Sequence, residues 1–224
     1  MYDFDRAIYL DAIENLVKNY AFNDFLSDPT SKNFSRWMEE MSDFPVLIYT
    51  GETKAVLWDK SWPCVIKIPF SHRDFDYCRA EVRNYKKAVK EGLERYFAFC
   101  DLLMEYPIEE GKTVPIYIME YAKVDEDYAR DTIYSYFSSG EHTVDSDYWG
   151  SLDDMDDEER ILAYLSDTLS VEEYETLRKF CMDNLINDLH TGNVAMQDGE
   201  IIFIDYSGFA HVEKTKNDPD WWVI

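Results

Sequence analysis

Apolar positions along this chain change their spacing several times, and each change predicts a different kind of element. Residues 4–26 carry apolar side chains three and four positions apart, which predicts an amphipathic helix, and residues 33–42 predict a second, shorter one. Short apolar runs separated by turn residues come next, and this pattern is typical of an antiparallel strand meander. The predicted strands cover residues 46–49, 55–58 and 64–68.

Helical spacing returns at residues 72–96, and two further apolar runs follow around 99–105 and 114–121. The block therefore reads strand, strand, strand, helix, strand, strand, and it ends at Ala122. We expect an antiparallel sheet accompanied by one helix.

The next segment is strongly acidic. Residues 123–175 hold 17 acidic and 3 basic side chains. Charge runs of this kind are usually solvated, so we expect a loop that leads into a helix at 157–168. Ser170 and Glu173 then form a capping-box pattern, which predicts the start of a helix over 171–186.

A tight hairpin is predicted near the end of the chain. Apolar runs at 194–196 and 200–204 flank the turn sequence Gln197-Asp198-Gly199. A hairpin closing at this turn would bring Asn193 and Asp205, which lie at its open end, close together.

Composition supports a folded protein and limits the function classes. Hydrophobic residues make up 46% of the 224 positions, which is enough for a packed core. The formal net charge is −24, so direct binding to DNA or RNA phosphates is not expected. The four cysteines lack the paired spacing of zinc or disulfide sites and are typical of reduced thiols in a cytoplasmic protein.

Targeting signals are not evident. The first residues lack the basic start and apolar run of a signal peptide. No stretch approaches the ~20 apolar residues that a membrane span needs. We therefore expect a cytoplasmic location and no membrane association.

Three polar residues near the predicted hairpin form a pattern suited to phosphoryl transfer. Asp188 is followed five residues later by Asn193, and Asp205 begins an Asp-x-x-Gly at the end of an apolar strand. Asp188 would orient or deprotonate an attacking hydroxyl. Oxygen atoms of Asn193 and Asp205 would suit a magnesium ion that also takes water and phosphate oxygens.

With this pattern the chain resembles the protein-kinase-like superfamily, above all small kinase-like proteins of bacteria and phages and the aminoglycoside and choline phosphotransferase branch. His190 stands where eukaryotic protein kinases usually have Lys. The resemblance extends upstream to about residue 44. It implies that Lys67 binds ATP phosphates and that Glu81 pairs with this Lys.

The resemblance also implies a hinge at Met119-Glu120-Tyr121-Ala122, with the backbone of Glu120, Tyr121 and Ala122 binding adenine. The phosphate-binding loop would contain Gly51, the one glycine of that segment. Glu52 beside it is unfavourable for a triphosphate, and Lys54 could compensate for this charge.

Two further positions depart from the family pattern. Ile186-Asn187 replaces the His or Arg that usually precedes the catalytic Asp, and only 19 residues follow Asp205. We therefore expect a truncated C-lobe, with the apolar tail at 221–224 either docked on it or binding a partner.

The predicted fold is α+β: a two-lobed, minimal protein-kinase-like fold with an antiparallel N-lobe sheet and a truncated helical C-lobe. The predicted domains are a helical N-terminal extension at 1–43, an N-lobe at 44–122 and a C-lobe at 123–224.

These features leave three functions open. The first is an ATP- and Mg²⁺-dependent phosphotransferase that moves the γ-phosphate to a hydroxyl, with Asp188, Lys67 and Glu81 as its catalytic residues. The second is a catalytically weak or inactive acidic protein that binds and inhibits a basic or nucleic-acid-handling partner. The third is a nucleotide-binding protein without turnover. For the first, a protein Ser/Thr acceptor is favoured over a small cationic alcohol or aminoglycoside.

Overall fold

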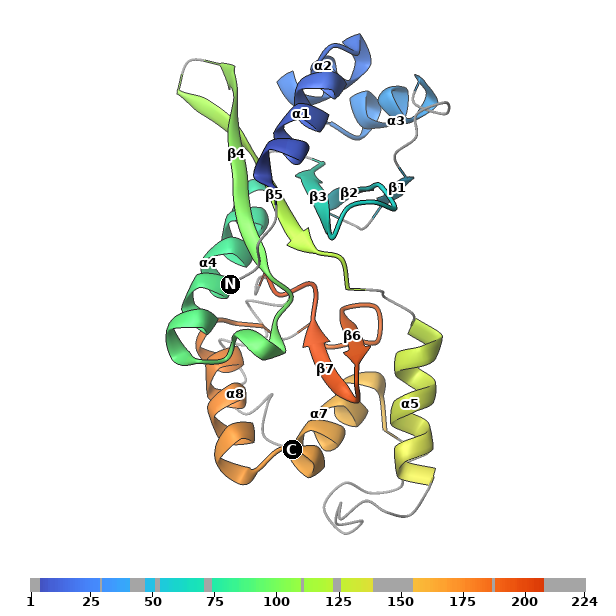
Figure 1. Cartoon of the computed structure of the whole chain (residues 1–224), viewed down its shortest axis with the longest axis vertical. Helices are drawn as coiled ribbons and strands as arrows, with labels where there is room; N and C mark the ends of the chain where they lie inside the picture. The colour runs from blue at the N-terminus through green and yellow to red at the C-terminus, as the bar shows by residue number, and fades with distance from the viewer. Residues whose placement is uncertain are drawn as a thin grey trace. The chain divides into compact units, whose positions relative to one another are not determined.

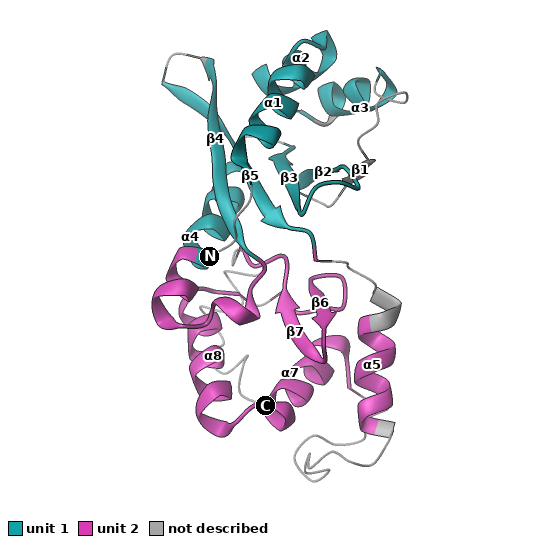
Figure 2. Cartoon of the chain, in the orientation of Figure 1, with its two compact units in different colours: residues 1–85, 99–121 teal, residues 86–98, 122–224 magenta. Residues whose placement is uncertain are grey.

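The computed structural model shows an α+β protein whose sheets are antiparallel, which confirms this part of the predicted fold (Figure 1). It describes residues 5–28, 30–40, 47–50, 53–70, 74–109, 111–122, 126–138, 155–186 and 188–207. The chain divides into two compact units, each described by itself here (Figure 2). Unit 1 comprises residues 1–85 and 99–121, and unit 2 comprises 86–98 and 122–224. The domain boundaries predicted at residues 43 and 122 stay predictions.

Unit 1 begins with helices, and the single helix predicted over 4–26 is wrong. The chain forms α1 (Arg6–Val17) and α2 (Tyr20–Ser27), followed by α3 (Ser31–Glu40). The break occurs at Asn19, whose backbone is extended and whose side chain accepts a hydrogen bond of 3.0 Å from the backbone N–H of Phe22. A side-chain cap of this kind starts a new helix, which periodicity alone could not reveal.

The predicted order of three strands, a helix and two strands is confirmed. The strands form one antiparallel sheet in the spatial order β1-β2-β3-β5-β4. The elements are β1 (Leu47–Thr50), β2 (Lys54–Trp58), β3 (Cys64–Pro69), α4 (Phe75–Glu91), β4 (Cys100–Glu109) and β5 (Lys112–Glu120). The helix predicted over 72–96 ends earlier, because Gly92 adopts a positive φ of 74° and a short 3-10 helix, Glu94–Tyr96, follows.

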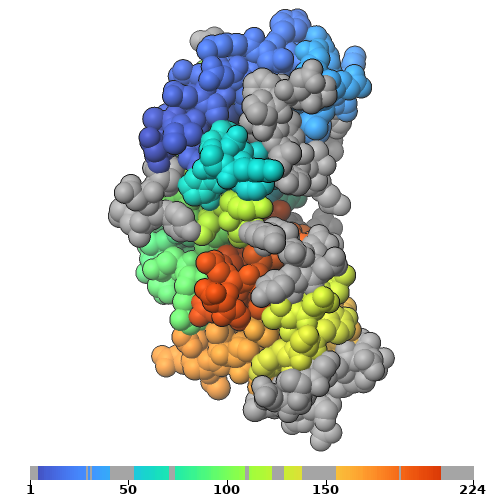
Figure 3. All heavy atoms as spheres, turned by 45° about the vertical axis from the view of Figure 1, so that its right-hand side comes forward, coloured from blue at the N-terminus to red at the C-terminus, as the bar shows by residue number. Residues whose placement is uncertain are grey.

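One face of this sheet is apolar and packs against the N-terminal helices. Figure 3 shows the atoms of these helices (blue) beside those of β2 and β3 (cyan). The helices contribute a cluster of aromatic rings in which Trp37 stacks on Phe25, with centroids 5.3 Å apart. The sheet contributes Ala55, Leu57, Ile66, Ile68, Ile116 and Ile118, all fully buried. These positions alternate along their strands, as the pleat requires for one face.

Among the described residues of unit 2, one helix was not predicted from the sequence. It is α5 (Glu126–Ser138), which lies within the acidic segment expected to be a loop. Its buried residues, Ala129, Ile133 and Phe137, recur every four positions and provide the missing signal. The acidic residues around them hid this stripe, because solvated charges can lie on the outer face of a helix as readily as in a loop.

The remaining helices of unit 2 agree well with the prediction. The helix α7 (Asp157–Thr168) has the predicted bounds, and α8 (Val171–Asp183) begins with the predicted capping box of Ser170 and Glu173. It ends three residues before the predicted position. Leu185 just beyond it has a positive φ of 58°, which no helix can contain.

The predicted hairpin is also confirmed. It pairs β6 (Val194–Gln197) with β7 (Glu200–Phe203). Asp198 and Gly199 both have positive φ, 53° and 83°, as a two-residue primed turn requires. Among the helices that the structure describes, none is long and apolar enough to cross a membrane.

The core between the N-terminal helices and the sheet should dominate the stability of unit 1. Substitution of Phe25 by Ala removes a fully buried ring and should lower the free energy of unfolding by about 3–5 kcal/mol. Ile8→Ala on α1 is the control, since that side chain is 48% exposed and should change the free energy by less than about 0.5 kcal/mol. Urea unfolding of both variants measures the difference, and similar values for the two would contradict this packing.

Candidate functional site

The second face of the unit 1 sheet carries two lysines and a tyrosine among apolar side chains such as Val56, Val65 and Met119. Lys67 lies opposite Val56 on β2 and opposite Tyr117 on β5 in the strand register. Lys54 lies two residues before Val56, so strand alternation places it on this same face. Lys54 and Lys67 are nevertheless only 4% and 7% exposed. The two lysines of this face are therefore sheltered from water.

The carboxylate of Glu81 reaches this face from α4. It is fully buried and lies within reach of both lysines. Lys54 Nζ donates a hydrogen bond of 2.7 Å to Glu81 Oε1, and Lys67 Nζ lies 3.8 Å from Glu81 Oε2. The hydroxyl of Tyr117 also donates to Oε2. The structure thus brings the two predicted residues Lys67 and Glu81 together at ion-pair distance.

Two members of this cluster were not predicted from the sequence as partners of Glu81. Tyr117 was assigned only to a strand, and Lys54 was considered only as compensation for Glu52. The missing signal is the pairing register of β2, β3 and β5, which puts Lys54, Lys67 and Tyr117 on the same face of the sheet. That register is set by tertiary pairing, so the sequence alone did not show it.

Cys78 lies on α4 three residues before Glu81 and shares its environment. Burial raises the pKa of its thiol to about 12, an increase that the nearby Lys54 ammonium partly opposes. Burial also raises the pKa of Cys64 to about 11. All four cysteines are buried and none forms a disulfide, in agreement with the expected reduced thiols.

The predicted hinge continues from β5. The backbone N–H of Glu120 donates to Phe99 O at 2.8 Å, and that of Tyr121 donates to Pro63 O at 2.9 Å. The Tyr121 ring stacks on Trp58, with centroids 4.1 Å apart and planes 13° apart. Two of the predicted adenine-binding N–H groups are therefore already used within unit 1. The chain passes to unit 2 at Ala122.

In unit 2, Ile186 and residues 188–193 lie outside helices and strands, and buried neighbours of Asp188 leave its side chain accessible. Ile186 and Leu189 are buried, whereas the side chain of Asp188 is 53% exposed. Asn193 Nδ2 donates to the backbone oxygen of Asp188 at 2.9 Å. Its backbone N–H donates to His190 O at 2.8 Å. These bonds fix the backbone around Asp188 while its carboxylate stays open to solvent.

His190 and Thr191 brace the same loop. The Nδ1 atom of His190 accepts a hydrogen bond of 3.1 Å from Gly192 N–H, and its Nε2 atom lies 3.9 Å from Asp188 Oδ1. Thr191 is buried, and its hydroxyl donates to Asp157 Oδ2 at 3.2 Å. His190 therefore supports the loop backbone with one ring nitrogen and faces Asp188 with the other.

The hairpin places Asn193 and Asp205 at its open end, as predicted. The backbone N–H of Ile204 donates to Asn193 O at 3.0 Å, which continues the β6–β7 pairing by one residue. Asp205 is the next residue and is half-buried. Asn193 uses its Nδ2 atom for the bond to Asp188, so its side-chain oxygen remains the atom suited to a metal. In the part of the chain that the structure describes, no group of three or more His, Cys, Asp or Glu could hold a metal ion by itself.

Some predicted positions lie outside the described residues. Gly51 and Glu52 of the predicted phosphate loop are among them, as are Asn187 and the tail at 221–224. The residues brought together thus form two sets. One comprises Lys54, Lys67, Glu81 and Tyr117 in unit 1, and the other comprises Asp188, His190, Asn193 and Asp205 in unit 2.

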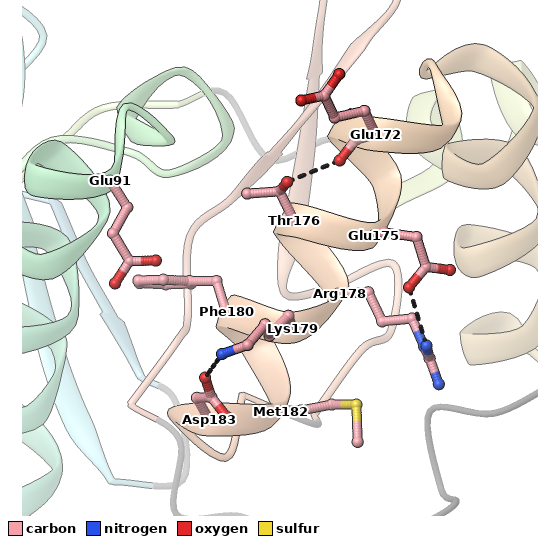
Figure 4. A pocket seen from close by; sticks show the side chains of 9 residues that line it. All are labelled: Glu91, Glu172, Glu175, Thr176, Arg178, Lys179, Phe180, Met182 and Asp183. Carbon is pink, nitrogen blue, oxygen red and sulfur yellow. Dashed lines mark hydrogen bonds and ion pairs between the residues drawn. The ribbon is translucent and has the colours of Figure 1, made fainter.

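A surface groove runs along α8 in unit 2 (Figure 4). Its charged pairs are Arg178 with Glu175 and Lys179 with Asp183. The residues that line it are Glu91, Glu172, Glu175, Thr176, Arg178, Lys179, Phe180, Met182 and Asp183. Acidic side chains outnumber basic ones, and the predicted catalytic residues do not line the groove.

Comparisons with protein families, with characterised proteins and with solved structures give no match to this chain.

The buried thiols should make stability fall at alkaline pH. The pKa of Cys78 is raised on folding, so its contribution is fully present below the unfolded value of about 8.5 and is lost as pH rises towards 12. Between these limits, the unfolding equilibrium constant should rise about tenfold per pH unit for this thiol. Urea unfolding at pH 7.5, 9 and 10.5 measures this slope. In Cys78→Ala, the unfolding equilibrium constant should rise less steeply with pH, by the contribution of one proton. An unchanged slope in this variant would count against the raised pKa.

Proposed function

We propose that this protein is an ATP- and Mg²⁺-dependent phosphotransferase with a two-lobed, kinase-like fold, and that its acceptor is a Ser or Thr hydroxyl of a protein. The observation that carries the proposal is the buried contact between Lys67 on β3 and Glu81 on α4. This pair was expected only from the resemblance to kinase-like proteins. Two residues fourteen positions apart, on different elements, approach to 3.8 Å.

The arrangement of elements supports the same proposal. After its three N-terminal helices, unit 1 has the chain order of three strands, one helix and two strands, and unit 2 is mainly helical with the β6–β7 hairpin. One of the three points at which the chain passes between the units, from Tyr121 to Ala122, lies within the predicted hinge. Because both N–H groups of Glu120 and Tyr121 are used in unit 1, we propose that Ala122 supplies the N–H donor to adenine.

The chemistry follows from the accessible carboxylate of Asp188. This carboxylate would accept the proton of an acceptor hydroxyl and orient its oxygen toward the γ-phosphorus of ATP. The new bond joins that oxygen to the γ-phosphorus, the bond to the β–γ bridging oxygen breaks, and ADP leaves. The Lys67 ammonium would neutralise phosphate charge. The attraction between opposite charges is stronger in a site sheltered from water than in water itself.

Asn193 and Asp205 would hold the magnesium ion. Both offer oxygen atoms, the ligand type that Mg²⁺ prefers, and they belong to neighbouring strand ends of one hairpin. When bound, Mg²⁺ would supply positive charge that offsets the negative charge developing during transfer. The two residues suffice for this because Mg²⁺ usually keeps several waters and takes phosphate oxygens as further ligands.

The net charge of −24 favours a basic acceptor protein. The acidic groove along α8 favours a second candidate function, in which the chain binds and inhibits a basic partner. In that case binding would not depend on ATP or on Asp188. The two functions therefore predict different effects of substituting Asp188: loss of phosphate transfer in the first case and unchanged partner binding in the second.

Transfer of labelled γ-phosphate to the protein itself or to basic proteins of a cell lysate tests the proposal. Substitution of Asp188 by Asn should lower the transfer rate about 10²–10⁴-fold, because a positioned proton acceptor contributes about that much. Asp131→Asn is the matched control, since Asp131 is an exposed carboxylate on α5, in the same unit. It should leave the rate unchanged. Absence of transfer by the wild-type protein with Mg²⁺ or Mn²⁺ would overturn the proposal.

Ligand binding provides a measurement that does not depend on turnover. Mg-ATP at 100 times its dissociation constant should stabilise the native protein by about 2.7 kcal/mol and raise its melting temperature. Asn193→Ala and Asp205→Ala should reduce the part of this shift that depends on Mg²⁺. A full shift without any transfer would indicate a nucleotide-binding protein lacking turnover. Pull-down of a basic partner, undiminished in Asp188→Ala and Asp205→Ala, would favour the inhibitory function.

A further inference from the structure

Lys54, Lys67 and Tyr117 contact the two oxygens of the Glu81 carboxylate in different ways. Lys54 Nζ lies 2.7 Å from Oε1, which is the length of a charge-assisted hydrogen bond. Lys67 Nζ lies 3.8 Å from Oε2, which is an ion pair but too long for a hydrogen bond. Oε2 instead accepts its hydrogen bond from the hydroxyl of Tyr117. Of these three contacts, the two direct hydrogen bonds therefore come from β2 and β5.

Burial makes the bond between Lys54 and Glu81 important. Glu81 is fully buried and Lys54 is 4% exposed, so each charge has lost nearly all of its contact with water. Removing one partner of a buried ion pair is strongly destabilising, because the other charge stays buried without compensation. The cost of losing Lys54 should exceed that of losing Lys67, since the longer contact contributes less attraction and no hydrogen bond.

We propose that Lys54 is the positioning residue for Glu81, and that this chain uses two lysines for what the resemblance assigns to one. Lys54 fixes the carboxylate of α4 through its hydrogen bond. Lys67, held to that carboxylate only at ion-pair distance, can then turn toward a phosphate without releasing Glu81. The role of Lys67 rests on the proposed function, whereas the role of Lys54 does not.

Double-mutant cycles in the full-length protein test the role of Lys54 without using activity. The first cycle combines Lys54→Met with Glu81→Gln, and the second combines Lys67→Met with Glu81→Gln. The coupling is read from unfolding equilibrium constants in urea. We expect a coupling of about tenfold or more for Lys54 with Glu81, as for hydrogen bonds to charged groups, and less than about threefold for Lys67 with Glu81.

A failure of single variants to fold still decides the question. If Lys54→Met does not fold but the Lys54→Met/Glu81→Gln double variant does, the pair is strongly coupled and the proposal is supported. Lys54→Arg retains the charge and should keep the stability closer to that of the wild type than Lys54→Met does. Equal coupling in the two cycles, or a larger coupling for Lys67, would overturn the proposal.

Affinity for Mg-ATP distinguishes positioning from a purely structural role. Measured well below the melting temperature of each variant, the dissociation constant should rise about tenfold in Lys54→Met and more in Lys67→Met, because charge-assisted contacts contribute about this much. Lys54→Arg should restore most of the affinity. An unchanged dissociation constant in folded Lys54→Met would overturn the positioning role. If the wild-type protein does not bind Mg-ATP, the proposed function fails, while the stability cycles still decide which lysine holds Glu81.

Discussion

A fully buried carboxylate, Glu81, is the constraint around which unit 1 is organised. A charge removed from water is tolerated only with hydrogen bonds and opposite charge around it. Glu81 receives these from β2, β3 and β5 at once, through Lys54, Lys67 and Tyr117. Sliding any of these strands by one residue would turn its polar side chain to the apolar face. The carboxylate therefore ties the register of three strands to the position of α4.

The sheet can hold this charged cluster because its other face is occupied by a large apolar core. Residues such as Ile66 and Ile118 face the aromatic cluster of α1–α3. Lys67 follows Ile66 in β3, so its side chain points to the opposite face, toward α4. The hydrophobic effect of the first face offsets the desolvation cost of the second. The N-terminal helices are thus part of the same packed unit as the sheet. Their packing against the apolar face stabilises unit 1 enough to tolerate the buried charges on the other face.

Unit 2 differs from unit 1 in that its candidate carboxylate is exposed to solvent, although the backbone around it is anchored. Asp188 remains accessible, but the loop around it is anchored by the buried side chains of Ile186 and Leu189. Asn193 adds bonds to the backbone of Asp188 and His190. Fixing the backbone while leaving the carboxylate in water would suit the role proposed for Asp188, because its geometry would be set before a substrate arrives.

Local sequence patterns are sufficient to predict the elements whose signals lie close together in the chain. The capping box of Ser170, the turn at Asp198 and Gly199, and the alternating strand runs all involve residues close in the chain, and the structure agrees with them. The break at Asn19 and the helix α5 were missed, because a cap and a stripe masked by acidic residues give weak local signals.

The candidate site divides in the same way. Lys67 and Glu81 were found through resemblance to a known family, and the structure brings them together. The shorter contact from Lys54 to Glu81 is evident only in the folded protein. The physical reason is that this contact depends on the pairing of β2 with β3 and on the depth of α4 against the sheet. Neither quantity is encoded in any short stretch of the chain.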